Sequence, residues 1–416
     1  MSRQQFTSRN NIGQILTLQK SGTTPSFDPT IMFSVGSRRV SWRLNNGTTT
    51  TQTAGNTLTY TGFTSDTNIR TIEMRGNSFK NINLFDLSND NLYGNINLSS
   101  LDKIANLTNF TLNDNINLTG ITNPSSDATV VNYNLSDCNL TGNLDLTPLS
   151  GLGGDFQVYN NPNLTGITHN PSSRIFTSYY AYDCGLAGNL NLPLSGLGGD
   201  FQVYSNPNLT GITHNPSSQI FTSYYVFDCG LVGNLDLTPL SGLGGQVIID
   251  INPNLTGITF PNSSNSFIDL TLDINNLIGV LDLTPLSGLS GSIDLNGNPL
   301  LTNVLLPNSI GDFSNNNILS IAFCNIDYIN IKPLSGANFN TCVISLNDNN
   351  MISTDVNHIL DDFSIMANNN QPLWSDIFLD IGGTNAPPDS SSGGYDGLAS
   401  ITFLTNPPYN WTITHS

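Results

Sequence analysis

The sequence predicts a mainly β fold in which the chain winds into a repeat solenoid, and three observations support this. The block 151–180 returns at 196–225 with only two changes, Ser205 in place of Asn160 and Gln219 in place of Arg174. A polar residue also recurs about every 23 residues along most of the chain. Finally, the 416 residues include 60 Asn but a single Glu, Glu73, and such a composition lacks the residues that favour long helices.

The polar residue closes a short pattern of alternating apolar positions. One half of the duplicated block reads Phe156-x-Val158-x-x-Asn161, and the other reads Tyr179-x-Ala181-x-x-Cys184. Alternation with a period of two predicts a strand, and the polar residue is expected to turn inward and bond the backbone. Twelve positions form this polar ladder: Asp90, Asn115, Cys138, Asn161, Cys184, Asn206, Cys229, Asn252, Asn275, Asn298, Cys324 and Asn349.

This pattern resembles leucine-rich repeat proteins over residues 70–353, and its L-x-x-N-P-x-L-T-G-I variant resembles surface proteins of the Bacteroidetes type. The resemblance implies a leucine-rich repeat solenoid of about 12 rungs of about 23 residues. A right-handed parallel β-helix has a similar rung length and also uses Asn ladders, so it stays the alternative.

The flanks of the repeats are expected to form separate modules. Residues 1–69 predict an extended arm (1–28) followed by a β-rich cap, with strands at 31–35, 40–43 and 58–60 and a turn at 45–47. Residues 354–416 predict a small α+β capping or attachment module. Its helix begins at Thr354 or Asp355 and carries Val356, Ile359, Leu360 and Phe363, and strands follow at 399–404 and 411–414.

The charge of −18 is unevenly placed along the chain. Residues 1–103 hold ten of the twelve Lys and Arg and six acids, for a net charge of +4, whereas residues 104–416 carry −22. The long acidic part is expected to repel nucleic acid and anionic membranes, because both are bound through Lys and Arg. The short basic part is suited to an acidic partner. Neither an apolar leader segment nor an apolar run of membrane-spanning length is visible, which predicts a cytoplasmic protein or one released by lysis.

The C-terminal residues carry a second resemblance. Asp380-Ile381-Gly382-Gly383-Thr384-Asn385-Ala386-Pro387, with Asn410-Trp411-Thr412-Ile413-Thr414, resembles a C-terminal segment of structural proteins of tailed bacteriophages, although Asn410 stands where that family usually has Gly. The resemblance implies a non-enzymatic virion protein, such as a fibre, spike or decoration protein, that assembles with other virion proteins and as a homo-oligomer. The alternative is a bacterial cell-surface adhesin or interaction module.

The titratable residues predict little chemistry. Cys138, Cys184 and Cys229 lie on alternate rungs, too far apart for a disulfide, and are expected to be buried thiols. His169 and His214 are expected to be exposed turn residues. Asp250 and Asp273 fall on adjacent rungs with Asp294 one column away, which fits an acidic stripe, a Ca²⁺ site or, less well, a hydrolase pair. No catalytic or cofactor motif is found, so we expect no enzyme activity and no cofactor.

The outward-facing positions of the strands give the candidate binding site. Aromatic residues occupy these positions on four consecutive rungs, and an aromatic stripe on a protein surface is typical of a binding site for sugar or protein. The alternative is aromatic packing that only stabilises the sheet. The predicted binding residues are Gln157, Tyr159, Tyr180, Tyr182, Gln202, Tyr204, Tyr225 and Phe227.

Overall fold

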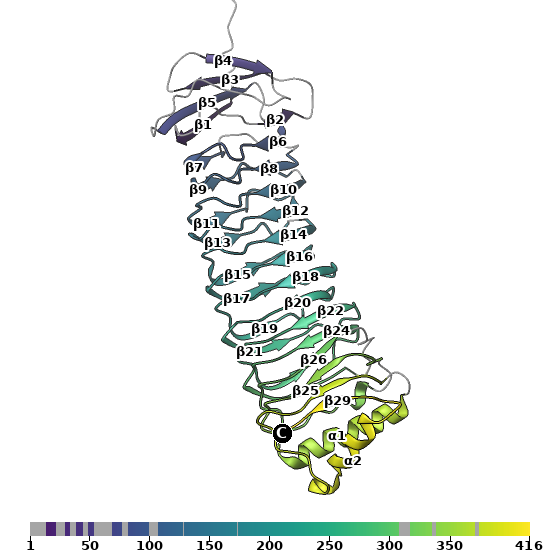
Figure 1. Ribbon diagram of the computed structural model, residues 1–416. Helices are drawn as coiled ribbons and strands as arrows, with labels where there is room; N and C mark the ends of the chain where they lie inside the picture. Colours follow the sequence, from purple (N-terminus) through teal and green to yellow (C-terminus); the bar gives the residue numbers. More distant parts are fainter. Residues whose placement is uncertain are drawn as a thin grey trace, which may run out of the picture. The chain divides into compact units, whose positions relative to one another are not determined.

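The computed structural model shows a mainly β protein built around a parallel β-solenoid of about 10 turns of about 23 residues (Figure 1). The chain divides into two units, Met1–Phe176 with Asp183–Gly185, and Thr177–Tyr182 with Leu186–Ser416. The residues described are 14–21, 30–33, 39–44, 49–53, 69–76, 82–99, 107–127, 129–172, 174–307, 317–334, 338–370 and 374–416. Side chains are described from residue 82 onward.

Each turn contributes one strand to a main sheet. In the first unit these strands are parallel and follow chain order, as β6 (Ile82–Asp86), β8 (Asn109–Thr111), β10 (Val130–Asn134) and β12 (Leu152–Gln157). In the second unit they are β14 (Phe176–Tyr180), β16 (Gly199–Gln202), β18 (Phe221–Tyr225), β20 (Gly245–Ile248), β22 (Phe267–Thr271), β24 (Leu289–Asp294), β26 (Ile318–Ser320), β27 (Val343–Ser345), β28 (Phe378–Asp380) and β29 (Thr412–Thr414).

The other side of most turns carries a second strand, and these strands pair into separate two-stranded ribbons. The first unit has β7 (Tyr93–Asn97) with β9 (Asn117–Thr122), and β11 (Gly142–Asp145) with β13 (Leu164–Thr168). The second unit has β15 (Ala187–Leu192) with β17 (Asn208–His214), β19 (Val232–Asp236) with β21 (Asn254–Thr259), and β23 (Ile278–Asp282) with β25 (Leu300–Leu305). In the described residues no ribbon strand follows β25, so about ten turns are two-sided rather than the twelve expected from the ladder.

The prediction that the side chains of the polar ladder turn inward and bond the backbone is confirmed. All twelve predicted ladder residues are buried. Asn161 shows how the amide is used, because its Nδ2 donates to the carbonyl oxygens of Leu135 and Val158, each at 2.9 Å. Its Oδ1 accepts from the backbone N–H of Leu140 at 3.0 Å. The amide thereby satisfies three backbone groups where the chain leaves the strand and would otherwise bury them unpaired.

The N-terminal strands form their own antiparallel sheet in the order β1 (Gln14–Ser21), β5 (Ile69–Gly76), β3 (Arg39–Leu44) and β4 (Thr49–Thr53). The prediction of an extended arm over 1–28 is therefore wrong for 14–21, which pair with β5. The strands expected at 31–35 and 40–43 correspond to β2 (Thr30–Phe33) and β3, and β2 pairs antiparallel with β6. The expected strand at 58–60 and turn at 45–47 lie outside the described residues.

The ladder continues beyond Asn349, the last residue that follows the period of about 23 residues. Strands β28 and β29 extend the main sheet, and the buried Asn385 accepts from the N–H groups of Asn349 and Met351. The 36-residue step from Asn349 hides this rung from the sequence period, because α1 (Ser353–Asn369) is inserted within it.

The helices of the C-terminal segment match the prediction only in part. Helix α1 buries Val356, Ile359, Leu360 and Phe363 as expected, but its N-cap is Ile352, with no side-chain bond. The strand predicted at 399–404 is wrong, because these residues lie in α2 (Gly397–Thr405). The side chain of Asp396 accepts from the N–H of Ala399 and so starts a helix that the apolar run alone does not indicate. Short 3₁₀ turns span Lys332–Leu334 and Ser392–Gly394.

Candidate functional site

Three aromatic rings form a stacked column on the outer face of the main sheet in the second unit. Tyr182 and Tyr204 have ring centroids 4.5 Å apart with planes 6° apart, and Tyr204 and Phe227 have centroids 4.4 Å apart with planes 5° apart. Each residue lies two positions after a main-sheet strand, and consecutive turns place the rings in register. All three side chains are half-buried. We call Tyr182, Tyr204 and Phe227 the aromatic column.

The flanking residues hold this face in place through side-chain bonds. Tyr180 lies 6.3 Å from Tyr182 between ring centroids, and its hydroxyl donates to Asp200 at 3.3 Å. The hydroxyl of Tyr225 donates to Oε1 of Gln246, whose amide donates in turn to Asp269 at 3.0 Å. Burial, followed by the negative charges of Asp200 and Asp269, raises the pKa of Tyr225. These two hydroxyls are therefore occupied within the sheet.

The remaining predicted site residues are divided between the two units. Gln202 is half-buried and lies between the turns of Tyr180 and Tyr225 in the second unit. Gln157 and Tyr159 are half-buried at the equivalent positions of the first unit. The structure thus groups Tyr180, Tyr182, Gln202, Tyr204, Tyr225 and Phe227 on one face of the second unit.

Carboxylates follow the aromatic column along the same strand positions. Asp250 and Asp273 take the place of Phe227 in the next two turns, and Asp294 lies opposite Thr271 in the neighbouring column. Burial, with the charges of the neighbouring carboxylates, raises the pKa of Asp250 and of Asp273 to about 6, and burial raises that of Asp294. Among the described residues, no group of three His, Cys, Asp or Glu side chains is placed to hold a metal ion, so this stripe gives no support to a Ca²⁺ site.

The prediction that His169 and His214 are exposed is wrong. Both rings are buried in the core, with 4% and 6% of their surface exposed. His169 packs edge-on against Phe156, and His214 Nε2 lies 2.9 Å from the hydroxyl of Tyr224. Burial lowers the pKa of His169 to about 3 and that of His214 to about 4. The imidazoles are therefore neutral at physiological pH and serve as core residues.

The pairing of His214 with Tyr224 is a polar bridge that the sequence interpretation missed. In an earlier turn Asn123 takes the place of the histidine, and Tyr133 donates to its Oδ1 at 2.9 Å. In both cases the polar residue precedes the tyrosine by ten positions, and this shared spacing was the available signal. The bridge satisfies a tyrosine hydroxyl that would otherwise be buried without a partner.

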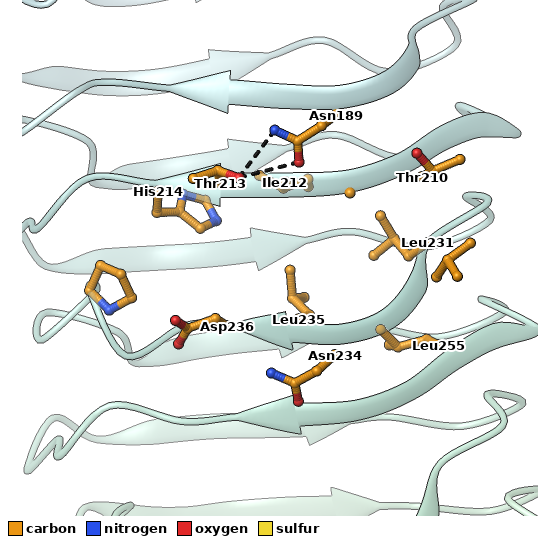
Figure 2. A pocket seen from close by; sticks show the side chains of 13 residues that line it. Asn189, Thr210, Ile212, Thr213, His214, Leu231, Asn234, Leu235, Asp236 and Leu255 are labelled. Carbon is orange, nitrogen blue, oxygen red and sulfur yellow. Dashed lines mark hydrogen bonds between the residues drawn. The ribbon is translucent and has the colours of Figure 1, made fainter.

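Depressions repeat on the ribbon side of the solenoid, where successive ribbons are not hydrogen-bonded. One of about 400 Å³ lies between β17 and β19 in the second unit, and Figure 2 shows Asn189, Thr213, His214 and Asp236 around it. Similar depressions of about 270 Å³ and about 420 Å³ lie between β21 and β23 and between β9 and β11. These depressions recur at the gaps between ribbons, and their lining residues change from turn to turn. We therefore attribute them to the repeat architecture and not to a dedicated binding site.

The cysteines behave as the ladder predicts. All five are buried and none is in a disulfide, and Cys138, Cys184 and Cys229 each donate to a backbone carbonyl oxygen. Burial raises the pKa of each of these three thiols to about 12, so they remain protonated. This matches buried structural cysteine rather than reactive thiolate.

Fold and surface together define a repeat-solenoid protein with an ordered aromatic and acidic face. Comparison with protein-family models, with curated proteins and with solved structures gives no match. Within the described residues, no helix is long and apolar enough to cross a membrane.

Proposed function

We propose that this chain is a non-enzymatic binding protein whose aromatic column contacts a macromolecular partner. The observation that carries the proposal is the stack of Tyr182, Tyr204 and Phe227, which holds rings in one fixed orientation on a half-exposed face. A rigid aromatic surface loses little conformational entropy on binding, and aromatic residues are enriched in interfaces.

The stacking also bears on the kind of partner. Neighbouring rings occupy each other's faces at 4.4–4.5 Å, so a sugar ring has no open face to stack on between them. The ring edges remain for contact, together with flanking groups such as Gln202. This arrangement favours a protein partner over a glycan held by ring stacking.

The proposed setting is a bacteriophage particle, in which the chain serves as a fibre, spike or decoration protein and meets other virion proteins or the host surface. The support is the sequence resemblance of Asp380–Pro387 and Asn410–Thr414 to a segment of tailed-phage structural proteins. In this proposal the solenoid is of the leucine-rich repeat type, and residues 354–416 attach it to the particle. The alternative setting is a bacterial cell-surface adhesin.

The experiment is to locate the chain in particles released by lysis of cells that produce it. Antibody labelling of purified particles in the electron microscope should place the chain on their surface. Purified particles that lack the chain, with the chain retained in the cell envelope instead, would favour the adhesin and reject the virion setting.

The non-enzymatic part of the proposal has its own test. Asp250 and Asp273 are the adjacent carboxylates that most resemble a hydrolase pair. Incubation of the protein with bacterial surface polysaccharide should release no reducing sugar. Release that Asp250→Asn abolishes would overturn this part of the proposal.

A further inference from the structure

The residue before each ladder residue holds its backbone in the left-handed region. Short polar residues or Gly take this position in most turns, for example Asp137, Asn160, Ser205, Asp228 and Gly297. Such residues tolerate this conformation because they lack bulk at Cβ or bond locally. The chain therefore follows a simple rule at this point of the turn.

Three turns break this rule. Ile251 and Ile274 have φ of 51° and Phe323 has φ of 55° at the same position. A β-branched or bulky residue is strongly disfavoured there, because its side chain crowds the backbone. The hydrogen bonding of the turn does not require an isoleucine at this position. The backbone N–H of Ile251 donates to the carbonyl oxygen of Asp273 at 3.1 Å, just as the N–H of Asp228 donates to the carbonyl oxygen of Asp250 at 3.2 Å.

Burial does not offset this strain. Ile251 is 43% exposed, and Ile274 and Phe323 are each 58% exposed. Gly297 leaves open the space beside Ile274, whose Cγ1 lies 3.6 Å from where a Cβ on Gly297 would be. We call Ile251, Ile274 and Phe323 the apolar ridge. Strained backbone that carries exposed apolar side chains marks a surface kept for a contact.

The surroundings of the ridge are acidic. Asp250 and Asp273 directly precede its two isoleucines, and Oδ1 of each carboxylate is buried without a hydrogen-bond partner. Residues 175–331 contain eleven Asp and no Lys or Arg. The patch therefore offers apolar contact beside uncompensated negative charge, which complements a surface rich in arginine, whose stem is apolar and whose head is basic.

We propose that the apolar ridge and its flanking carboxylates bind the basic N-terminal part, residues 1–103, of a second copy of this chain. That part holds ten of the twelve Lys and Arg of the sequence and a net charge of +4, against −22 for the remainder. Its strand β3 carries Arg39 and Arg43 on one face of the N-terminal sheet, because side chains alternate along a strand. The methylene stems of arginine can cover apolar surface while the guanidinium meets a carboxylate. The contact joins two different surfaces, the N-terminal part of one copy and the apolar ridge of the next. Repeated contacts of this kind build either an open chain of copies or a closed ring. The contact involves other residues than the aromatic column and goes beyond the proposed function.

Sedimentation of the full chain over a range of concentrations tests the proposal. The wild type should associate, and raising NaCl from about 50 to 500 mM should weaken the association, because salt screens the charges. The double variant Ile251→Asn with Ile274→Asn should weaken it at least about tenfold while raising the thermal midpoint, because Asn accepts the left-handed backbone. Ser205→Asn, at the same position of another turn, should leave the association unchanged.

A mixing experiment distinguishes binding of the ridge to the N-terminal part of another copy from binding of one ridge to another ridge. The variant Arg38→Ser with Arg39→Ser and Arg43→Ser should not self-associate, but it should form a one-to-one complex with the double isoleucine variant, since each supplies the half that the other lacks. Circular dichroism checks that the arginine variant is folded. A monomeric wild type, association that the isoleucine variants leave unchanged, or folded variants that fail to complement each other would overturn the proposal.

Discussion

Tyr204 and Phe227 stack on consecutive turns with ring centroids 4.4 Å apart and planes 5° apart. Tyr182 lies on the other face of Tyr204 at 4.5 Å, so the middle ring is covered on both sides. The period of the solenoid thus sets the ring spacing, and the column stabilises the sheet as well as shaping its surface.

The first prediction concerns the middle ring of the column. Tyr204→Phe keeps both stacked contacts, as Phe227 shows in the next turn, and should leave the free energy of unfolding nearly unchanged. Tyr204→Ser removes both contacts and should lower it by about 1–3 kcal/mol. Urea unfolding followed by circular dichroism measures the difference. Equal stability of the two variants would show that stacking contributes nothing.

The second prediction concerns pH and His214. Burial lowers its folded pKa to about 4, below the unfolded value of about 6.5. The unfolded chain therefore binds the proton more readily, so the stability contributed by the neutral imidazole is complete above pH 6.5 and is lost as pH falls towards 4. The total loss is about 3 kcal/mol.

His214→Asn isolates this contribution, because Asn123 makes the equivalent bond to Tyr133 in an earlier turn. Urea unfolding at pH 7.5 and pH 4.5 should show a smaller loss of stability on acidification for the variant than for the wild type. Parallel losses in the two proteins would contradict a buried, neutral His214.

The third prediction concerns Asp273, whose contribution to stability depends on pH in the opposite direction from that of His214. Burial and the charges of Asp294 and Asp250 raise the folded pKa of Asp273 to about 6, above the usual carboxyl value. The ionised carboxylate therefore costs stability as pH rises through about 6. Asn296 occupies the same position in the next turn, so an amide fits there.

Asp273→Asn should therefore stabilise the protein at pH 7.5 by about 1 kcal/mol, a figure that allows for solvent screening of a half-exposed group. The gain should vanish below about pH 4, where the wild-type carboxyl is protonated in both states. Thermal unfolding across this range checks the prediction, and a gain that does not depend on pH would contradict it.

The fourth prediction concerns the polar ladder. Asn161→Ala leaves the carbonyl oxygens of Leu135 and Val158 and the N–H of Leu140 without the amide that binds them, at a cost of about 3 kcal/mol. Asn161→Cys should cost less, because the chain uses Cys at alternate ladder positions and Cys184 donates to the carbonyl oxygen of Val158. Urea unfolding of the two variants should reproduce this order, and a Cys variant no more stable than the Ala variant would contradict it.

The ladder and the strands beside it could be predicted from the sequence because both depend on local spacing. Cys138 and Asn161 are 23 residues apart, and that period places them on adjacent turns. Other features depend on tertiary packing. His169 lies beside turn residues in the sequence, yet Phe156 and Phe176 enclose its ring. The run at 399–404 has strand composition, but it lies in α2, whose first turn is capped by the side chain of Asp396.

In the candidate site, too, the features set by sequence spacing could be predicted, and those set by tertiary packing could not. Spacing in the sequence was enough to place Tyr182, Tyr204 and Phe227 on successive turns. It did not reveal that the rings stack face to face, because side-chain orientation depends on neighbours 22 or 23 residues away. The left-handed backbone of Ile251 was also hidden, since an isoleucine in a repeat reads as an ordinary apolar residue.

Adsorption of the purified protein to host bacterial cells tests most directly whether the aromatic column is a binding surface. Tyr182→Ser with Tyr204→Ser should lower adsorption at least about tenfold at a temperature at which the variant is folded. Tyr224→Phe, a control on the buried side of β18 that loses the bond to His214, should adsorb like the wild type. Unchanged adsorption of the double serine variant would contradict the account.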